Sequence, residues 1–294
     1  FMEHDFLYLK HGLGPGNLFQ MQKYSSMGGM DLVCHQMTIG ERRRDIYQLP
    51  KLTSSISHVY GKKDDLAMCE IFGGYDQELT YPEMKWLTDH HQVRGVNFMI
   101  THSLNPRAPE DTDYPPYFYN MDKEPRWPLY KVWADYNSRL AAMLTGGRHV
   151  CPVALLFCGN SGQAGRAVTP EDMTTALQDA LYDCDWLPYD VFEKEASFDG
   201  AALRLGRESY RVLIVPPVEA IPVETLRKVR DFLNAGGVVA GYGFLPAVSA
   251  TPGGGAAEIA SLCMEIWGES PAPSITALKV GATGGRAYFF NEAP

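Results

Sequence analysis

The sequence predicts an α/β protein in which β-strands and helices alternate along the whole chain. Short apolar runs rich in β-branched residues recur between helical stretches and glycine-rich turns. The hydrophobic fraction of 45% and the charged fraction of 21% are typical of a globular chain. The composition changes near Gly146-Gly147, and we therefore expect two domains, 1–148 and 149–294.

The first half reads as three successive strand–helix units. Strands are predicted at 28–37, 66–75 and 96–104, with helices at 51–62, 80–95 and 128–147. Each unit takes about 30–40 residues, which is the pitch of a (β/α)8 barrel. The pattern therefore indicates part of such a barrel.

The second half predicts a doubly wound parallel sheet. Strands are predicted at 149–158, 186–192, 210–217 and 238–244, and helices at 169–184, 222–237 and 256–268. The sequence carries no GxGxxG, no Walker lysine and no nucleophile elbow. We therefore expect a structural domain without a cofactor, and a candidate surface for homo-oligomer formation.

Composition excludes several classes of protein. Acids outnumber bases 35 to 26, which gives a net charge of −9 and argues against nucleic-acid binding. No apolar run is long enough to cross a membrane, and the first residues carry no signal-peptide core, so we expect a bacterial cytoplasmic location. The 6 cysteines show no CxxC spacing; we expect buried thiols and no metal site.

Glu70 is the strongest candidate for a catalytic residue. It lies inside the apolar run LAMCEIFG, where a carboxylate is costly to bury unless it is paired. Strand ends of a parallel barrel carry the catalytic side chains, and a glycine-rich turn follows Glu70 at once. Two interpretations stay open: a catalytic nucleophile or base, or a buried carboxylate held by an arginine or by backbone donors.

Six further residues are candidates for substrate binding: His35, Gln36, Tyr75, His102, Tyr117 and Trp127. The histidines and the glutamine lie at the ends of predicted strands, where they would either donate hydrogen bonds to hydroxyl groups or serve the fold. The aromatic side chains would either stack on apolar ring faces of a ligand or pack a loop against the barrel.

Several motifs resemble the C-terminal part of a glycoside hydrolase barrel. They are SSISHVYGK, CEIFGGY, MKWLTDHHQVRGVNFMITHSL, the PPYFY loop and WADYNSRLAAMLTGGRHVCPVALLF. The chain is similar to glycoside hydrolase family 106, the alpha-L-rhamnosidases, and more distantly to families 2 and 42. The resemblance covers about residues 20–160. The remainder fits only the architecture of a flavodoxin-like or class I glutamine-amidotransferase-like domain without its catalytic residues.

The resemblance implies a function. Glu70 would be one of two catalytic carboxylates, at the end of barrel strand 7, between strand 6 (30–37) and strand 8 (96–103). The partner carboxylate would follow strand 4, which this sequence does not contain. We therefore expect a fragment of a glycoside hydrolase that acts on a plant or microbial carbohydrate. The alternative is a non-catalytic carbohydrate-binding or structural barrel remnant.

Overall fold

The computed structural model describes residues 17–40, 44–107, 114–119, 123–159, 164–168, 170–268 and 277–292. The chain divides into two compact units, Phe1–Gly147 and Arg148–Pro294. Both units are built on parallel sheets, as the sequence predicts for an α/β protein.

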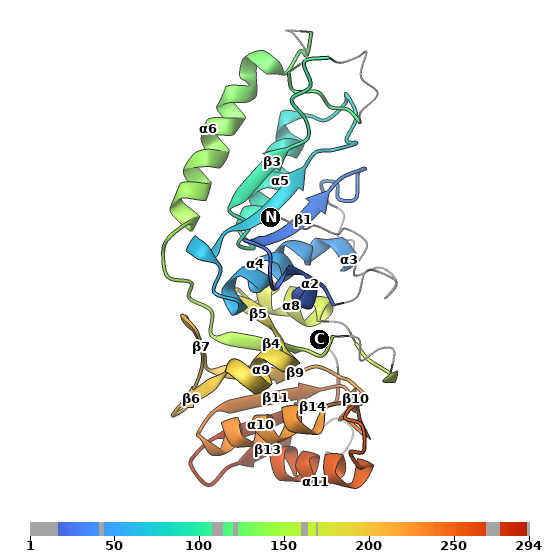
Figure 1. The fold of residues 1–294 in the computed structure, drawn as a ribbon, viewed down its shortest axis with the longest axis vertical. Helices are drawn as coiled ribbons and strands as arrows, with labels where there is room; N and C mark the ends of the chain where they lie inside the picture. The colour runs from blue at the N-terminus through green and yellow to red at the C-terminus, as the bar shows by residue number, and fades with distance from the viewer. Residues whose placement is uncertain are drawn as a thin grey trace. The chain divides into compact units, whose positions relative to one another are not determined.

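The first unit is built on a three-stranded parallel sheet. Strands β1 (Gly28–Leu32), β2 (Ala67–Ile71) and β3 (Phe98–Thr101) pair in chain order (Figure 1). Each strand lies inside a predicted run and is shorter than that run. The residues that follow each strand form loops at the carboxyl edge of the sheet.

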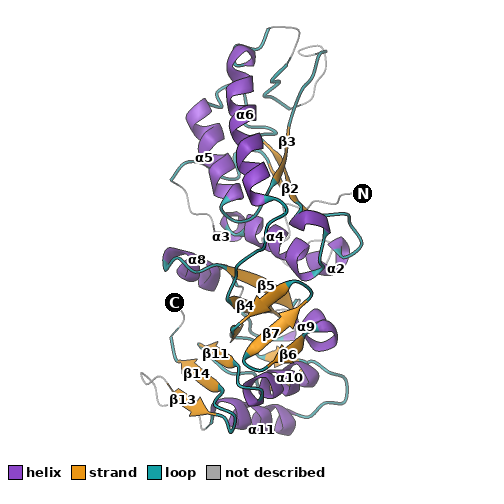
Figure 2. Cartoon of the chain, turned by 90° about the vertical axis from the view of Figure 1, so that its left-hand side faces the viewer, coloured by secondary structure: helices purple, strands orange, loops and turns teal. Residues whose placement is uncertain are grey.

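Helices connect and follow these strands. They are α2 (Leu18–Gln22), α3 (Arg44–Tyr47), α4 (Leu49–Val59), α5 (Tyr81–Gln92) and α6 (Trp127–Leu144), with a short 3-10 turn, η1 (Lys63–Asp65). Helices α5 and α6 pack side by side (Figure 2). The Trp133 indole donates across this contact to the Thr88 hydroxyl, at 2.9 Å.

Helix α4 packs unusually close to β1. A Cβ on Gly28 would lie 2.3 Å from the Thr53 carbonyl oxygen, so any side chain there would clash with the helix backbone. Ser57 closes the contact, since its hydroxyl accepts from the Gly28 amide at 3.0 Å and donates to the Leu66 carbonyl at 2.6 Å. The helix therefore occupies one face of the sheet directly.

The SHVYGK motif at the end of α4 has a structural role. The Lys62 ammonium donates to the backbone carbonyls of Gln22, the last residue of α2, and of Lys23 and Ser25 just after it. It also lies 5.5 Å from the centre of the Tyr60 ring. Burial lowers the pKa of Lys62. The lysine thus ties the carbonyl end of α2 to the end of α4.

The second unit contains a six-stranded sheet of order β13-β14-β11-β9-β4-β5. The strands are β4 (Val153–Phe157), β5 (Cys184–Pro188), β9 (Val212–Val215), β11 (Val238–Tyr242), β13 (Ala277–Val280) and β14 (Arg286–Phe290). Only β13 runs antiparallel, at the edge. Every residue of β4 is buried, as expected for a strand covered on both faces.

Four helices and two small sheets complete the described part of this unit. The helices are α8 (Glu171–Asp179), α9 (Tyr189–Glu195), α10 (Val223–Asn234) and α11 (Ala256–Trp267). An antiparallel sheet joins β6 (Ser197–Asp199), β7 (Ala202–Leu205) and β8 (Glu208–Tyr210), and β10 (Ala220–Ile221) pairs with β12 (Val248–Ser249).

Two predicted elements of the second unit need correction. The predicted strand 186–192 ends at Pro188, and the residues after it form α9. Pro188 has no backbone N–H of its own to donate to the ladder, which favours an end to the strand there. The predicted helix 169–184 ends at Asp179. Leu181 has a φ of +63°, which a right-handed helix does not allow, and Cys184 is already the first residue of β5. The expected cap of that helix, Thr169, lies outside the described residues.

The cores of both units are apolar. The fully buried side chains of the first unit include Met30, Leu32, Leu52 and Ile71. Those of the second unit include Leu155, Leu213, Leu226, Phe232 and Val239.

Among the helices of the described residues, none has the length and hydropathy that crossing a bilayer requires.

Two histidines of α5 are buried and make the first unit sensitive to acid. Burial lowers the pKa of His91 to about 4, and burial together with the nearby His91 and Arg94 lowers the pKa of His90 to about 2. Both groups take up protons more readily in the unfolded chain. The stability that their neutral forms provide is complete above about pH 6.5 and is lost as the pH falls toward 4.

We therefore predict that the free energy of unfolding of His91→Gln falls less between pH 6.5 and pH 4 than that of the parent protein. The difference between the two falls should be about 3 kcal/mol. Urea denaturation at a series of pH values measures it. The exchange of exposed His35 for Gln controls for the loss of a histidine. An unchanged pH slope in His91→Gln would contradict the prediction.

Candidate functional site

Glu70 lies on the face of the first sheet that the helices leave free. Thr101 of β3 faces α6, because its hydroxyl lies 2.9 Å from the Tyr130 hydroxyl. Neighbouring residues of a strand point to opposite faces, so Ile100 faces away from α6. Glu70 pairs with Ile100 across the ladder and therefore shares its direction. The predicted catalytic carboxylate is half-buried on this helix-free face.

A second carboxylate lies beside Glu70. Asp31 of β1 is the direct register partner of Glu70 and is buried. Burial raises the pKa of the Cys69 thiol well above its usual value, and the negative charges of Asp31 and Glu70 raise it further. Because Asp31 and Glu70 are register partners, the sheet carries two adjacent acids on the same face. Sequence analysis missed Asp31, although it also stands as a single acid inside an apolar strand.

Two glycines bring the loops at the carboxyl edge close together. A Cβ on Gly73 would lie 3.0 Å from the Val33 side chain and 3.2 Å from the His102 ring. Gly74 has a φ of +66°, and a Cβ there would lie 3.0 Å from the Cys34 sulfur. A larger residue would strain both positions. The turn after Glu70 therefore lies against the residues that follow β1 and β3, His102 included.

His35 belongs to a small polar group on the same edge. Its Nε2 lies 3.3 Å from a carboxylate oxygen of Asp76, and both side chains are exposed. Its ring lies 4.8 Å from the Tyr75 ring. Tyr75 is fully buried, and its hydroxyl donates to the Met37 carbonyl at 2.6 Å. Burial raises the pKa of Tyr75. Tyr75 thus supports the loop that presents His35.

Gln36 acts locally in the same loop. Its side-chain oxygen accepts from the Val33 amide at 2.9 Å, which closes the turn after β1. This is the arrangement of a strand-end cap. The expected contact of Gln36 with a ligand stays a prediction.

The aromatic candidates pack the loop before α6. Trp127 lies 4.9 Å from the Tyr119 ring and 5.6 Å from the Tyr130 ring, which is on the helix side of the sheet. Tyr117 is buried, next to fully buried Phe118. Of the two interpretations open from the sequence, these contacts favour packing of the loop over stacking on a ligand.

Arg126 joins the loop after β2 to the start of α6. Its guanidinium donates to the Leu79 carbonyl and to the Gln77 side chain, each at 2.8 Å. It also pairs with Glu124 at 2.5 Å, and both side chains are buried. Tyr81 donates to the Arg126 carbonyl. One buried cation therefore fixes two loops at the carboxyl edge.

These features define an α/β protein with adjacent carboxylates and two histidines near the carboxyl edge of a parallel sheet. The structure brings together Glu70, Asp31, His102 and the His35 loop; it leaves Trp127 on the helix side. Comparison with known proteins then gives the family. The family model of the alpha-L-rhamnosidases, glycoside hydrolase family 106, matches residues 15–287, and the chain belongs to this family.

Solved structures share the fold at low identity. A rhamnosidase from Novosphingobium sp. PP1Y superposes with a TM-score of 0.64 and 18% identity, over 92% of this chain and 25% of that chain. A GH42 beta-galactosidase from G. stearothermophilus gives a TM-score of 0.60 and 13% identity, over 93% of this chain and 47% of the other. Both similarities support a glycosidase α/β fold that is compatible with a TIM-barrel-like arrangement.

One curated relative is similar in sequence. A putative beta-glucuronidase from Formosa agariphila is 26% identical over 205 residues, which is 66% of this chain and 16% of the relative. The chain thus spans a small part of this relative and a quarter of the rhamnosidase.

The Arg126 contacts generate a stability prediction. Loss of the guanidinium leaves the Glu124 carboxylate buried without its cation, which typically costs about 3–5 kcal/mol. We expect Arg126→Gln to lower the free energy of unfolding by this amount, as measured by urea denaturation followed through tryptophan fluorescence. Lys131→Gln, which breaks an exposed ion pair on α6, should cost less than about 1 kcal/mol. Equal losses in the two variants would contradict a central role of Arg126.

Proposed function

We propose that this chain is part of a larger glycoside hydrolase that cleaves O-glycosidic bonds of a plant or microbial carbohydrate, with Glu70 as one of two catalytic carboxylates. Membership of an alpha-L-rhamnosidase family supports the class of reaction. The observation that carries the proposal is the direction of Glu70, which points away from the helices near the carboxyl edge of the sheet.

We also propose that β1, β2 and β3 are strands 6, 7 and 8 of a (β/α)8 barrel. They run parallel in chain order, with helical segments α4, α5 and α6 after them, as the strands of such a barrel do. The outer strand β3 has Phe98 and Ile100 exposed at 43% and 37%. Apolar side chains on the helix-free face are what other barrel strands would bury.

The outer surface of α6 supports the same arrangement. Val132 is 67% exposed and Met143 is 80% exposed. An apolar groove of about 400 Å³ lies between α5 and α6, lined in part by Leu129, Val132 and Trp133. Exposed apolar side chains beside such a groove are costly in water, and we propose that another part of the longer protein covers this surface.

The carboxylates suit the known chemistry of glycoside cleavage. One carboxylic acid protonates the leaving oxygen, and a second carboxylate attacks the anomeric carbon or activates water. Glu70 serves as the nucleophile or base in this scheme, and the partner is the acid expected after strand 4. Asp31 adds a negative charge next to Glu70, which favours the positive charge that develops on the sugar ring.

Polar groups on the same edge suit a polyhydroxylated substrate. We propose that His35 and His102 donate hydrogen bonds to sugar hydroxyls. Tyr75 and Gln36 fix the loop that carries His35, through their bonds to Met37 and Val33. Tyr117 and Trp127 shape the neighbouring loop by packing.

We propose that the second unit is a flavodoxin-like domain. Its five parallel strands follow the order β5-β4-β9-β11-β14, which is 2-1-3-4-5 when they are numbered along the chain. This order is that of flavodoxin-like doubly wound sheets. The missing nucleophile elbow supports a non-catalytic role.

The role of Glu70 can be tested in the longer protein with a panel of aryl glycosides that includes an alpha-L-rhamnoside. Glu70→Gln should lower kcat about 100- to 10,000-fold, because it removes a group that acts on the reacting atoms. Glu78→Gln is the matched control, since Glu78 is an exposed acid in the loop after β2. Retained hydrolysis in Glu70→Gln would refute the assignment, and binding without hydrolysis by the parent protein would indicate a carbohydrate-binding remnant.

The contribution of Asp31 can be separated from a structural one. Asp31→Asn keeps the shape of the side chain and removes its charge. We expect kcat to fall about tenfold or more, with a melting temperature close to that of the parent protein. A lower melting temperature with unchanged kcat would instead mean that Asp31 serves only the fold.

A further inference from the structure

We propose that His149, Cys151 and Asp183 form a binding site for a zinc-class divalent ion at the amino ends of β4 and β5. Ligand atoms of these three side chains all lie within 4.8 Å of one another. Zinc bonds of about 2.0–2.3 Å in a tetrahedron place ligand atoms about 3.3–3.8 Å apart. Small side-chain movements therefore suffice to complete the site.

The second unit fixes the backbone on both sides of the site. His149 and Cys151 come just before β4, and Asp183 comes just before β5. The two strands are neighbours, with Val153 of β4 in register with Cys184 of β5. An Asp183 oxygen accepts from the Cys184 amide at 2.9 Å, which orients this carboxylate. The ligands thus come from the segments that lead into two adjacent, hydrogen-bonded strands.

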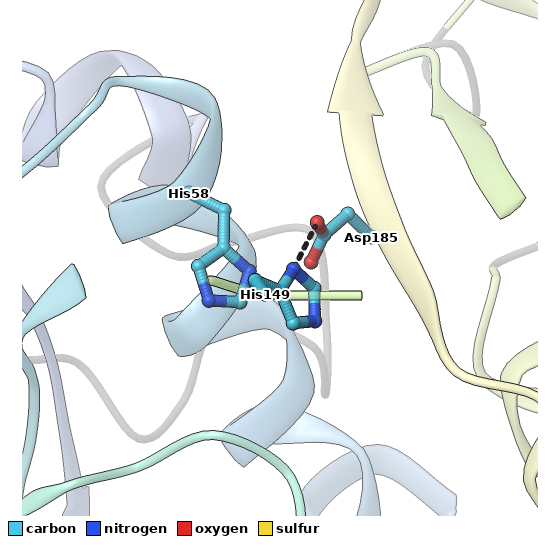
Figure 3. A group of neighbouring side chains, drawn as sticks. All are labelled: His58, His149 and Asp185. Atoms are coloured by element: carbon cyan, nitrogen blue, oxygen red, sulfur yellow. Dashed lines mark ion pairs between the residues drawn. The ribbon is translucent and has the colours of Figure 1, made fainter. Parts of the chain in front are cut away.

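Surrounding carboxylates orient the imidazole for metal binding. Nδ1 of His149 lies 3.1 Å from a Glu208 oxygen and 3.5 Å from an Asp185 oxygen (Figure 3 shows the pair with Asp185). Tyr210 donates to that same Asp185 oxygen at 3.0 Å. When a carboxylate holds the proton on Nδ1, the free lone pair of the ring is on Nε2. Nε2 lies 2.9 Å from a carboxylate oxygen of Asp183. This is the usual support of a metal-bound histidine.

The charge of the cluster favours a divalent cation. Three carboxylates, from Asp183, Asp185 and Glu208, lie within 3.5 Å of the two ring nitrogens of His149. A protonated imidazole offers them only one positive charge. In the metal-free protein the Cys151 thiol donates to the Val153 carbonyl at 3.3 Å; metal binding would release that proton.

The ligand set points to zinc rather than calcium or magnesium. Calcium and magnesium prefer oxygen ligands alone, whereas nitrogen, sulfur and carboxylate oxygen together suit zinc. The Cys151 sulfur is buried, and the Asp183 side chain is 37% exposed, which gives the ion a path from solvent.

The position suggests an ion that holds strands together, with water in the fourth coordination position that the three side chains leave open. Ligands of doubly wound sheets bind outside the carboxyl ends of the strands, whereas this cluster lies at the amino ends of β4 and β5. An ion there would clamp the two strands together. Sequence analysis expected no metal site because His149 and Asp183 are 34 residues apart, and only the pairing of β4 with β5 brings them together.

Cobalt and zinc titrations of the metal-stripped 294-residue chain test this inference. Co²⁺ should give a thiolate-to-cobalt charge-transfer band in the near ultraviolet, and zinc should abolish it by displacement. Cys151→Ser should lose the band, and Asp183→Asn should weaken zinc binding in calorimetry about 10- to 100-fold. Zinc should also raise the melting temperature of the parent chain.

Two matched variants control for other sites on the chain. Cys34→Ser removes the exposed thiol and should keep the band. Asp199→Asn removes an exposed carboxylate that pairs with Arg204, and it should keep the zinc affinity. The inference is overturned if the parent chain binds neither ion, or if the band survives in Cys151→Ser while it disappears in Cys34→Ser. Unchanged zinc affinity in Asp183→Asn would also overturn the three-ligand site.

Discussion

The close packing of α4 on β1 determines which face of the first sheet is available for chemistry. Gly28 lets the helix backbone approach so closely that no side chain fits between them, and Ser57 bonds the strand to the helix. Helices then occupy that face of all three strands. Because side chains alternate along a strand, Asp31 and Glu70 are directed to the other face.

This arrangement also explains how Glu70 can stand inside an apolar strand, although Asp31 beside it is buried. On the helix face Glu70 would be buried in the core, where an unpaired carboxylate is costly. On the opposite face Glu70 is only half-buried, and the glycine turn that follows keeps the loop backbone close to it. Arg126 fixes the next part of that loop to the start of α6. The frame around the carboxylates is therefore held by buried polar contacts.

The second unit uses its two sheet edges differently. Around the carboxyl ends of its strands, the sequence shows none of the phosphate-binding or nucleophile motifs of related sheets. Charged side chains gather instead at the amino ends of β4 and β5, around His149. A buried thiol beside these groups completes the ligand set that we propose for a metal ion. The proposed ion would therefore join two strands at the sheet edge opposite the one where doubly wound sheets bind their ligands.

Local sequence alone determined the alternation of strands and helices, the candidate Glu70 and the resemblance to family 106, because apolar periodicity, glycine turns and short motifs are local properties. The apolar run 186–192 predicted a strand that is too long, because the strand ends at Pro188. Tertiary structure alone decided that Asp31 lies beside Glu70, that Trp127 packs on the helix side, and that His149 meets Asp183. Those results depend on strand register and on which face the helices cover, and both are fixed by contacts between residues far apart in the chain.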